Sequence, residues 1–208
     1  MTVLMSGFEP FNHDTRNPSE EVLKQLPDML NGHSLIKVVL PVVYERAYEV
    51  LKPLIVDHQP DIIVLLGLAA GRQGVSVERI AINCMDGALA DNHGTCHRHQ
   101  AIIPNGPDGL FTTYPLDRLM PRAKEAKLPI TLSNTAGTFV CNETMYRVLY
   151  ETQKSTKKTY AGFIHLPYLD DQVNDEKTPS MNLETIKDTL LWILHELLDE
   201  YQNGGHND

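Results

Sequence analysis

Cys141 has the clearest chemical setting in this chain, because it lies where a loop passes into a helix. Residues 128–134 are typical of a short buried strand, and residues 141–150 combine helix formers with apolar or aromatic side chains at helical spacing. The thiol therefore falls in the first turn of a helix. There the free N–H groups and the helix dipole favour a thiolate, the form of cysteine that acts as a nucleophile.

A histidine that could serve this thiol follows the next predicted strand. Residues 160–164 form an apolar run, and His165 comes directly after it. A Cys and a His presented from the ends of two successive strands is the arrangement that a cysteine nucleophile and its base require. Taken alone, Cys141 could equally be a small buried side chain, and His165 a hydrogen-bonded histidine at a strand end.

Glu78 is the best candidate for the group that would orient this histidine. Residues 75–82 alternate in polarity, and the alternation places Glu78 on one face with two isoleucines. A carboxylate on an apolar face needs a partner, and an imidazole would be one. The alternative is that Glu78 only pairs with an arginine such as Arg72 or Arg79, and the residues by themselves favour that alternative.

Two further segments give weaker signals. Cys96 and His99, with His93 nearby, hint at a metal site, but the segment does not specify ligand number or geometry. Residues 67–72 contain two glycines but lack the patterns of phosphate-binding loops. We therefore expect neither a metal nor an organic cofactor.

Strand-like and helix-like runs alternate along the chain. The expected strands cover residues 2–6, 36–40, 62–66, 75–82, 128–134 and 160–164, and the expected helices cover 17–30, 44–57, 116–127, 141–150 and 181–201. Proline should kink or break the second helix at Pro53, and Pro121 should make the third helix short or bent. This alternation predicts an α/β fold with a mostly parallel sheet covered by helices on both faces. Sites in such folds form at the carboxyl ends of the strands, where Cys141 and His165 would meet.

Composition limits the classes of function. The chain has 208 residues, which suggests one domain over 1–208, with a frayed tail at 203–208. Its net charge of −9 argues against a nucleic-acid or membrane partner. The longest apolar run, residues 62–71, is far too short to span a membrane. Three cysteines and no signal-peptide pattern favour the reducing cytoplasm.

Eight short motifs occur along the chain in the order in which they occur in a known family. They are Gly7-Phe-Glu-Pro-Phe11, Asn17-Pro18, Leu40-Pro-Val42, Gly67-Leu-Ala-Ala-Gly-Arg72, Glu78-Arg-Ile-Ala-Ile-Asn83, Ser133-Asn-Thr-Ala-Gly137, Cys141-Asn142 and Phe163-Ile-His-Leu-Pro167. From residue 3 to about residue 200 the chain resembles the type I pyroglutamyl peptidases (pyrrolidone-carboxylate peptidases), which are cytosolic cysteine peptidases.

This resemblance implies a three-layer α/β/α sandwich and a catalytic triad of Glu78, His165 and Cys141. It implies a thiol protease, a hydrolase that removes N-terminal pyroglutamate (5-oxoproline) from peptides through a thioester acyl-enzyme, without a cofactor. It also implies an assembly into homotetramers, which are common among bacterial members.

The resemblance further implies a pocket for the flat, neutral lactam ring. The residues that match this pocket are Phe8, Phe11, Phe139 and, as a polar neighbour, Asn17.

One segment departs from the family pattern. Where members usually read Asp-Ala-Arg-Ile-Pro-Asp-Asn, this chain reads Asp86-Gly-Ala-Leu-Ala-Asp-Asn92, so that Ala88 replaces an arginine that lies close to the catalytic cysteine in relatives. The missing arginine leaves open a binder of pyroglutamyl peptides with weakened or lost turnover. A second alternative is a related hydrolase or nucleoside phosphorylase-like enzyme, because those folds also place their sites at these strand ends.

Overall fold

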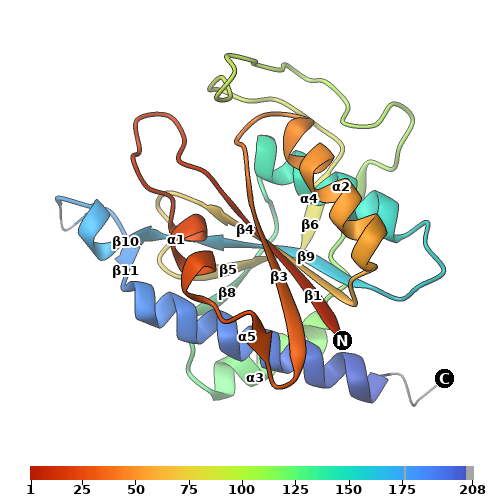
Figure 1. Ribbon diagram of the computed structural model, residues 1–208. Helices are drawn as coiled ribbons and strands as arrows, with labels where there is room; N and C mark the ends of the chain where they lie inside the picture. Colours follow the sequence, from red (N-terminus) through yellow and green to blue (C-terminus); the bar gives the residue numbers. More distant parts are fainter. Residues whose placement is uncertain (176, 205–208) are drawn as a thin grey trace.

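A seven-stranded sheet forms the centre of the computed structural model, which describes residues 1–175 and 177–204 (Figure 1). The elements are β1 (Thr2–Phe8), α1 (Pro18–Gln25), β2 (Met29–Leu30), β3 (His33–Leu40), α2 (Arg46–His58), β4 (Ile62–Leu68), β5 (Val75–Glu78), β6 (Ile80–Ile82), β7 (Gly109–Phe111), α3 (Leu116–Glu125), β8 (Ile130–Ser133), α4 (Val140–Thr152), β9 (Tyr160–Leu166), β10 (Tyr168–Leu169), a 3₁₀ turn η1 (Asp170–Gln172), β11 (Ser180–Met181) and α5 (Leu183–Asn203).

The sheet is mostly parallel. Its strand order is β2-β3-β1-β4-β9-β5-β8, and β3, β1, β4 and β9 run in one direction. The short β2 is antiparallel to β3, and β5 is antiparallel to β9 but parallel to β8. The alternation of strands and helices along the sequence predicted this class of fold, and the prediction is confirmed.

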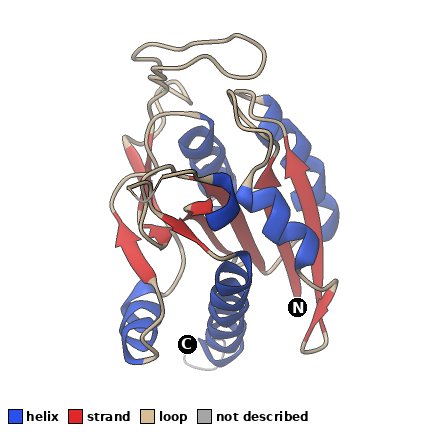
Figure 2. Ribbon diagram, turned by 90° about the vertical axis from the view of Figure 1, so that its left-hand side faces the viewer, coloured by secondary structure: helices blue, strands red, loops and turns tan. Residues whose placement is uncertain are grey.

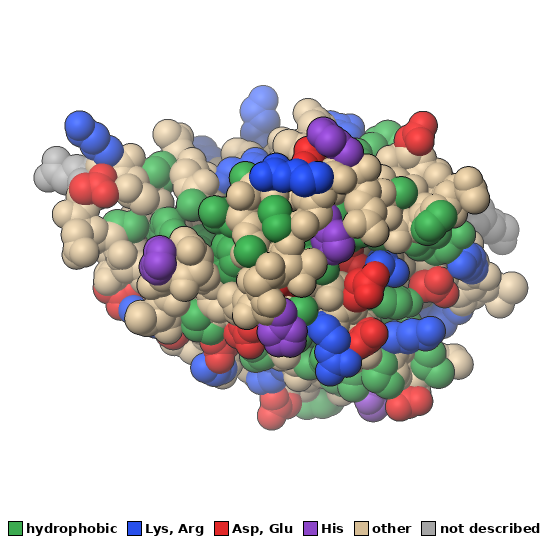
Figure 3. All heavy atoms as spheres, turned by 90° about the horizontal axis from the view of Figure 1, so that it is seen from above, with side chains coloured by type: hydrophobic (Ala, Val, Ile, Leu, Met, Phe, Trp, Pro, Cys, Tyr) green, Lys and Arg blue, Asp and Glu red, His purple; other side chains and the backbone are tan. Residues whose placement is uncertain are grey.

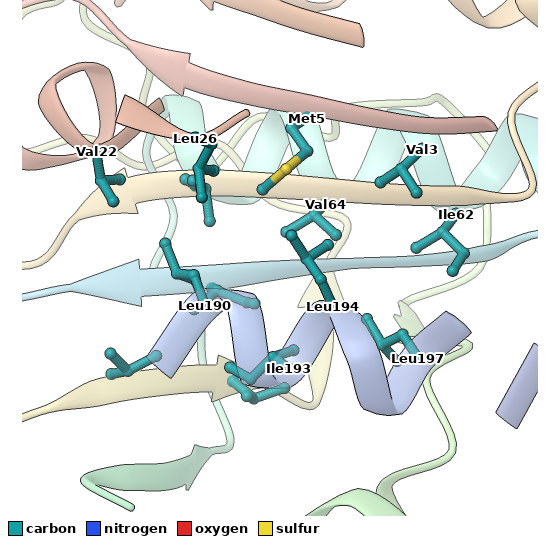
Figure 4. Packing of buried hydrophobic residues seen from close by; sticks show 14 of the residues in the cluster. Val3, Met5, Val22, Leu26, Ile62, Val64, Leu190, Ile193, Leu194 and Leu197 are labelled. Atoms are coloured by element: carbon teal, nitrogen blue, oxygen red, sulfur yellow. The ribbon is translucent and has the colours of Figure 1, made fainter. Parts of the chain in front are cut away.

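Helices cover both faces of the sheet, which makes the fold an α/β/α sandwich. In Figure 1, α2 and α4 lie above the sheet, and α3 and α5 lie below it. Two apolar cores result, one on each face. In the core between α5 and the sheet, Leu190, Leu194 and Leu197 contact the valine, isoleucine and methionine side chains of β1 and β4 (Figure 4). The strands between the cores are buried on both sides, as their uninterrupted apolar runs indicate.

The first helix is shorter than expected. It ends at Gln25 and not near Leu30, and the chain then forms β2. Leu26 has φ −70° and ψ 144° because Pro27 follows it, and a residue before proline is pushed out of the helical region.

The segment 75–82 is also not the single alternating strand that was expected. It is interrupted at Arg79, so that β5 belongs to the main sheet and β6 pairs with β7 in a separate two-stranded antiparallel sheet. All four residues of β5 are buried, since the strand lies inside the sheet with helices on both sides. By contrast β8, expected to be buried, is an edge strand and half-exposed.

Prolines do not interrupt the helices in which they occur. Helix α2 continues through Pro53 and α3 continues through Pro121. Both prolines are exposed, so the carbonyl groups that lose an amide partner can bond to water.

No helix in the described ranges is both long and apolar enough to cross a membrane. Of the tail expected to fray at 203–208, residues 205–208 lie outside the described part of the chain.

Helix α1 approaches strand β1 very closely at Gly7. A Cβ atom on Gly7 would lie 2.5 Å from the carbonyl oxygen of Ser19, which is a rigid backbone atom. The hydroxyl of Ser19 also accepts a hydrogen bond of 2.9 Å from the amide of Phe8. Glycine at this position therefore allows the helix to lie against the end of the strand.

We expect Gly7→Ala to lower the free energy of unfolding by about 2–3 kcal/mol, since neither backbone can yield without disturbing the core. Gly32→Ala is the matched control, because Gly32 has φ +80° but no atom within 4 Å of its Cβ position. Left-handed backbone strain alone should cost the control about 1 kcal/mol. Urea unfolding of both variants measures the difference, and equal losses would mean that the close contact is unimportant.

Candidate active site

Three neighbouring strands bring the predicted site residues together on one face of the sheet. In the parallel pair β4–β9, Gly67 lies opposite His165, and in the antiparallel pair β9–β5, His165 lies opposite Ser76. Glu78 is two residues beyond Ser76 and therefore points to the same face, in the diagonal position where long side chains can meet. The register of these strands places Glu78 beside His165.

Glu78 and His165 form a buried pair. The distance from His165 Nδ1 to Glu78 Oε1 is 2.8 Å, Glu78 is fully buried and His165 is 5% exposed. An ionised carboxylate can only accept, so Nδ1–H donates this bond, and Nε2 is the ring nitrogen that remains free to take a proton. This is the orientation that a general base requires.

Arg72 also binds Glu78. Its Nη2 lies 3.3 Å from Glu78 Oε1 and donates to Ser133 Oγ at 3.1 Å as well. The carboxylate therefore binds both the imidazole and the arginine. The sequence had left open which of the two would be its partner. Sequence reasoning did not include Arg72 in the site; its position at the end of the glycine-containing segment 67–72 was the available signal.

Cys141 lies over the sheet next to His165. It is the second residue of α4, and its Sγ lies 3.1 Å from the point that a Cβ on Gly67 would occupy. The same Cβ would be 2.8 Å from Cζ of Phe163, so only glycine at this position leaves room for both the thiol and the phenyl ring. Because Gly67 is the sheet neighbour of His165, the thiol and the imidazole share this part of the face.

Asn142 fixes the start of α4. Its side chain accepts a hydrogen bond from the amide of Ile82 at 2.9 Å and donates to the carbonyl groups of Ile82 and Cys84 at 2.9 and 3.0 Å. Asn142 is fully buried, and these bonds connect the helix to the segment that follows β6. The sequence offered only its adjacency to Cys141 as a signal.

The beginning of α4 keeps backbone donors available. Its N-cap residue, Phe139, makes no side-chain capping bond, and the first intrahelical bond is donated by the amide of Glu143. The preceding amides of the first turn therefore point outward, next to the thiol. Such amides can stabilise a negative oxygen that develops on a bound carbonyl group.

The surroundings of Cys141 disfavour its thiolate form. Burial, together with the negative charge of Glu78, raises the pKa of the Cys141 thiol to about 12. The expectation from the sequence, that the helix start favours a thiolate, is thus outweighed by loss of solvent. A thiol with a raised pKa needs a base to take its proton before it can act as a nucleophile.

An aromatic group lies beside Cys141 and is centred on Phe139. The ring centroids of Phe11 and Phe139 are 5.0 Å apart, and Tyr44 meets Phe139 edge-on at 5.3 Å. Phe8 lies elsewhere: it is 2% exposed and packs against Phe163, whose ring in turn contacts His165. The structure thus brings Phe11 and Phe139 together and places Phe8 in the core, where Phe163 separates it from His165.

Asn17 acts as the N-cap of α1. Its side-chain oxygen accepts from the amide and the hydroxyl of Ser19, and its nitrogen donates to the carbonyl of Glu9 at 2.9 Å. These bonds close the base of the loop that carries Phe11. Its lactam-binding role stays a prediction, while its effect on the position of this loop is direct.

Arg98 and His99 lie near Asp86, which is hydrogen-bonded to the segment that precedes Cys141. The amide of Asp86 donates to the carbonyl of Thr138 at 3.0 Å, and the Thr138 hydroxyl donates to the carbonyl of Asp86 at 2.8 Å. Arg98 and His99 lie 3.6 and 3.3 Å from the Asp86 carboxylate, whereas Ala88 is exposed.

Over residues 1–175 and 177–204, no three or more His, Cys, Asp or Glu side chains are grouped to hold a metal ion.

The sequence model of the family described as "Pyroglutamyl peptidase" matches residues 1–195. The chain belongs to this family. The pyrrolidone-carboxylate peptidase of Thermococcus onnurineus is 45% identical over 186 residues, covering 89% of this chain and 93% of the relative. That of Thermococcus kodakarensis is 40% identical over 206 residues, covering 99% and 100%.

Solved structures of family members have the same fold. Pyrrolidone carboxyl peptidase from Pyrococcus furiosus superposes with a TM-score of 0.91 at 34% identity, covering 97% of this chain and 100% of that one. Pyroglutamyl peptidase I from Bacillus amyloliquefaciens gives a TM-score of 0.90 at 33% identity, covering 96% and 98%. The similarity therefore extends over nearly the whole chain.

The raised pKa of Cys141 predicts how its reaction with iodoacetamide depends on pH. Only the thiolate reacts, so the alkylation rate should rise about tenfold per pH unit from pH 8 to pH 10, still below the pKa of about 12. In the urea-unfolded chain the same cysteine should approach a plateau above about pH 8.5. Mass spectrometry of the peptide that contains Cys141 measures both rates. A plateau near pH 7 in the folded protein would indicate a preformed thiolate–imidazolium pair instead.

Proposed function

We propose that this chain is a cysteine peptidase that removes N-terminal pyroglutamate from peptides, with Cys141 as nucleophile, His165 as base and Glu78 as the group that orients the base. The observation that carries the proposal is the buried 2.8 Å contact between Glu78 and His165, on the strand neighbouring the glycine over which Cys141 lies. Membership of the pyroglutamyl peptidase family supplies the substrate class.

The first half of the reaction forms a thioester. His165 takes the proton of Cys141 through Nε2, and the sulfur attacks the carbonyl carbon that joins the pyroglutamyl residue to the next residue. The carbonyl oxygen becomes negative and is bound by amides at the start of α4. Glu78 balances the positive charge of the imidazolium, so the buried pair can hold the extra proton without water entering the site.

The second half releases the product. The imidazolium of His165 gives its proton to the departing amine, the carbon–nitrogen bond breaks, and the shortened peptide leaves. A water molecule then loses a proton to His165 and attacks the thioester, which frees pyroglutamate and restores the thiol. These steps use a thiol, an imidazole and a carboxylate, and require no cofactor.

Selectivity for the lactam follows from desolvation. Phe11 and Phe139 offer apolar surface beside the thiol, which suits a flat ring without charge. An ordinary N-terminus carries a positive charge, and burying that charge unpaired among phenyl rings would be costly. In this proposal Phe8 supports the site from below, through Phe163, and Asn17 holds the loop of Phe11.

The decisive test is release of a fluorogenic amine from a pyroglutamyl amide under reducing conditions. We expect turnover by the wild type and a loss of at least about 10³-fold in kcat/KM for Cys141→Ser, because a serine hydroxyl is much harder to deprotonate. Cys84→Ser is the matched control and should keep full activity, since its thiol is not part of the proposed machinery.

Glu78→Gln probes the orientation of the base. Glutamine keeps the shape but cannot balance the imidazolium charge, so kcat should fall by about 10²–10⁴-fold while KM changes little. A folded, reduced wild type that binds the substrate without releasing amine would contradict the peptidase proposal. It would favour the alternative of a binder that has lost turnover.

We also propose that the chain works as a homotetramer in the cytoplasm, on the basis of its resemblance to bacterial members of the family. A thiol nucleophile and three unpaired cysteines suit a reducing compartment. Light scattering should then give about four times the chain mass of 23.4 kDa at micromolar concentration. A single species of monomer mass at that concentration would contradict the tetramer.

A further inference from the structure

The buried carboxylate of Glu78 has few partners that can compensate its charge. Both of its hydrogen bonds reach the same oxygen, because His165 Nδ1 lies 2.8 Å and Arg72 Nη2 lies 3.3 Å from Oε1. The second oxygen, Oε2, is buried and has no partner in the described part of the chain. Burying a carboxylate is unfavourable unless an opposite charge compensates it. Among the described residues, only Arg72 pairs a permanent positive charge with this carboxylate.

A tight turn after β4 presents Arg72 to Glu78. The amide of Arg72 donates to the carbonyl of Ala69 at 3.3 Å, and Gly71 between them has φ +84°. A positive φ at the third of four residues is the type II turn, which favours glycine. The amide of Ala69 donates to the carbonyl of Leu166, directly after His165, at 2.9 Å. The turn that carries Arg72 is therefore bound to the end of the strand that carries His165.

Neutral groups hold the Arg72 guanidinium in place. Its Nη2 donates to Ser133 Oγ at 3.1 Å and to the carbonyl of Thr135 at 3.3 Å, and the Ser133 hydroxyl donates to the same carbonyl at 3.1 Å. These acceptors fix the guanidinium without cancelling its charge. The Arg72 side chain is 33% exposed, so water weakens the effect of this charge on Glu78 but leaves part of it.

The ionisable groups close to Glu78 come from three elements. His165 lies on β9, Arg72 follows β4, and Cys141 on α4 has a thiol that responds to the Glu78 charge. Figure 2 faces the side of the molecule that carries β10, where loops, drawn in tan, follow the strand ends. The surface seen from above in Figure 3 mixes acidic and basic side chains, so that face adds no strong field of one sign. The nearby groups therefore determine the charge of the pair.

We propose that Arg72 is a positioning residue that keeps the Glu78–His165 pair free of an extra proton and thereby sets the lower pH limit of activity. This inference rests on the function proposed above, in which His165 must start as a neutral base. Without Arg72, the negative charge of the pair would be buried and uncompensated, so the pair would take up a proton at higher pH, on either group. A pair that already holds a proton cannot stabilise the second proton that Cys141 must give.

The pH dependence of turnover tests this inference. For Arg72→Gln, we expect the acid limb of kcat/KM for a pyroglutamyl amide to move up by about one pH unit. The loss relative to the wild type should therefore be about tenfold larger at the acid end of the profile than on its plateau. Arg72→Lys keeps the charge and should leave the acid limb within about 0.3 pH unit of the wild type.

Arg79→Gln is the matched control, because it removes the same charge one residue away from Glu78. Arg79 is exposed and donates a 2.8 Å bond to Asn134, so its loss should leave the acid limb unchanged. A purely structural role for Arg72 would instead lower the Tm and reduce turnover equally at every pH, which would overturn the proposal. Should Arg72→Gln fail to fold, Arg72→Met, which keeps the apolar stem, replaces it in the same comparison.

Proton uptake can also be followed without turnover. In Cys141→Ser, the NMR signal of the His165 ring shows when the pair binds a proton, and its loss in His165→Gln identifies it among the 9 histidines. Adding Arg72→Gln to Cys141→Ser should raise the midpoint of this titration by about one pH unit. A midpoint that moves by less than about 0.3 pH unit would contradict the role of Arg72.

The outcomes separate the two proposals. If the wild type releases amine but neither the acid limb nor the His165 titration responds to Arg72→Gln, the role of Arg72 is wrong and the peptidase proposal stands. If the wild type releases no amine, the peptidase proposal fails. The titration in Cys141→Ser still decides whether Arg72 controls the charge of the Glu78–His165 pair.

Discussion

The contact between Glu78 and His165 is the interaction on which the rest of the site depends. Burying a carboxylate is unfavourable unless the group is paired and hydrogen-bonded, and this one has no exposed surface. Its Oε1 receives both His165 and Arg72, and this fixes the ring of His165 with Nε2 free. The pairing follows from the register of β5, which runs antiparallel to β9 and puts the Glu78 side chain on the diagonal from His165. Without that reversal, a parallel neighbour would present different residues at this level of the sheet.

Two opposing effects act on the pKa of the Cys141 thiol. A helix start attracts negative charge, yet the position that brings Cys141 over Gly67 leaves it only partly exposed to water and places it near the charge of Glu78. Burial has the larger effect, so the pKa of the thiol is raised. In the reaction proposed above, the proton of Cys141 therefore moves to His165 and not to solvent. Glu78, whose charge helps to raise the pKa of the thiol, would then also stabilise the imidazolium.

Local patterns in the sequence predicted the fold class and the elements that carry Cys141 and His165, because apolar periodicity and helix-start signals act over a few residues. The end of α1 at Gln25 was not predicted, although Pro27, two residues later, is a sequence signal for it. The role of Glu78 was reached by an argument from alternation that the structure does not support, since β5 is buried on both faces. Strand order and direction depend on contacts between segments far apart in the chain. For that reason the partners of Glu78, the function of Asn142 and the meeting of Tyr44 with Phe139 could not be derived from local patterns.

The loop that contains residues 91–97 shows how a segment without regular structure can organise a site. Its centre is Asp91, a buried carboxylate that gathers amides from its own loop and the amide of Tyr44, which precedes α2. Through Asp86 the same stretch of chain is bound to Thr138, just before the helix of Cys141. The loop thus connects the start of α2 to the start of α4, and Tyr44 and Phe139 meet where these starts converge. None of these contacts involves Glu78 or His165, so a change in this loop would act first on the aromatic group and on the start of α4. In the function proposed above, the aromatic group that would receive the lactam and the Glu78–His165 pair that would move the proton are thus held by separate sets of contacts.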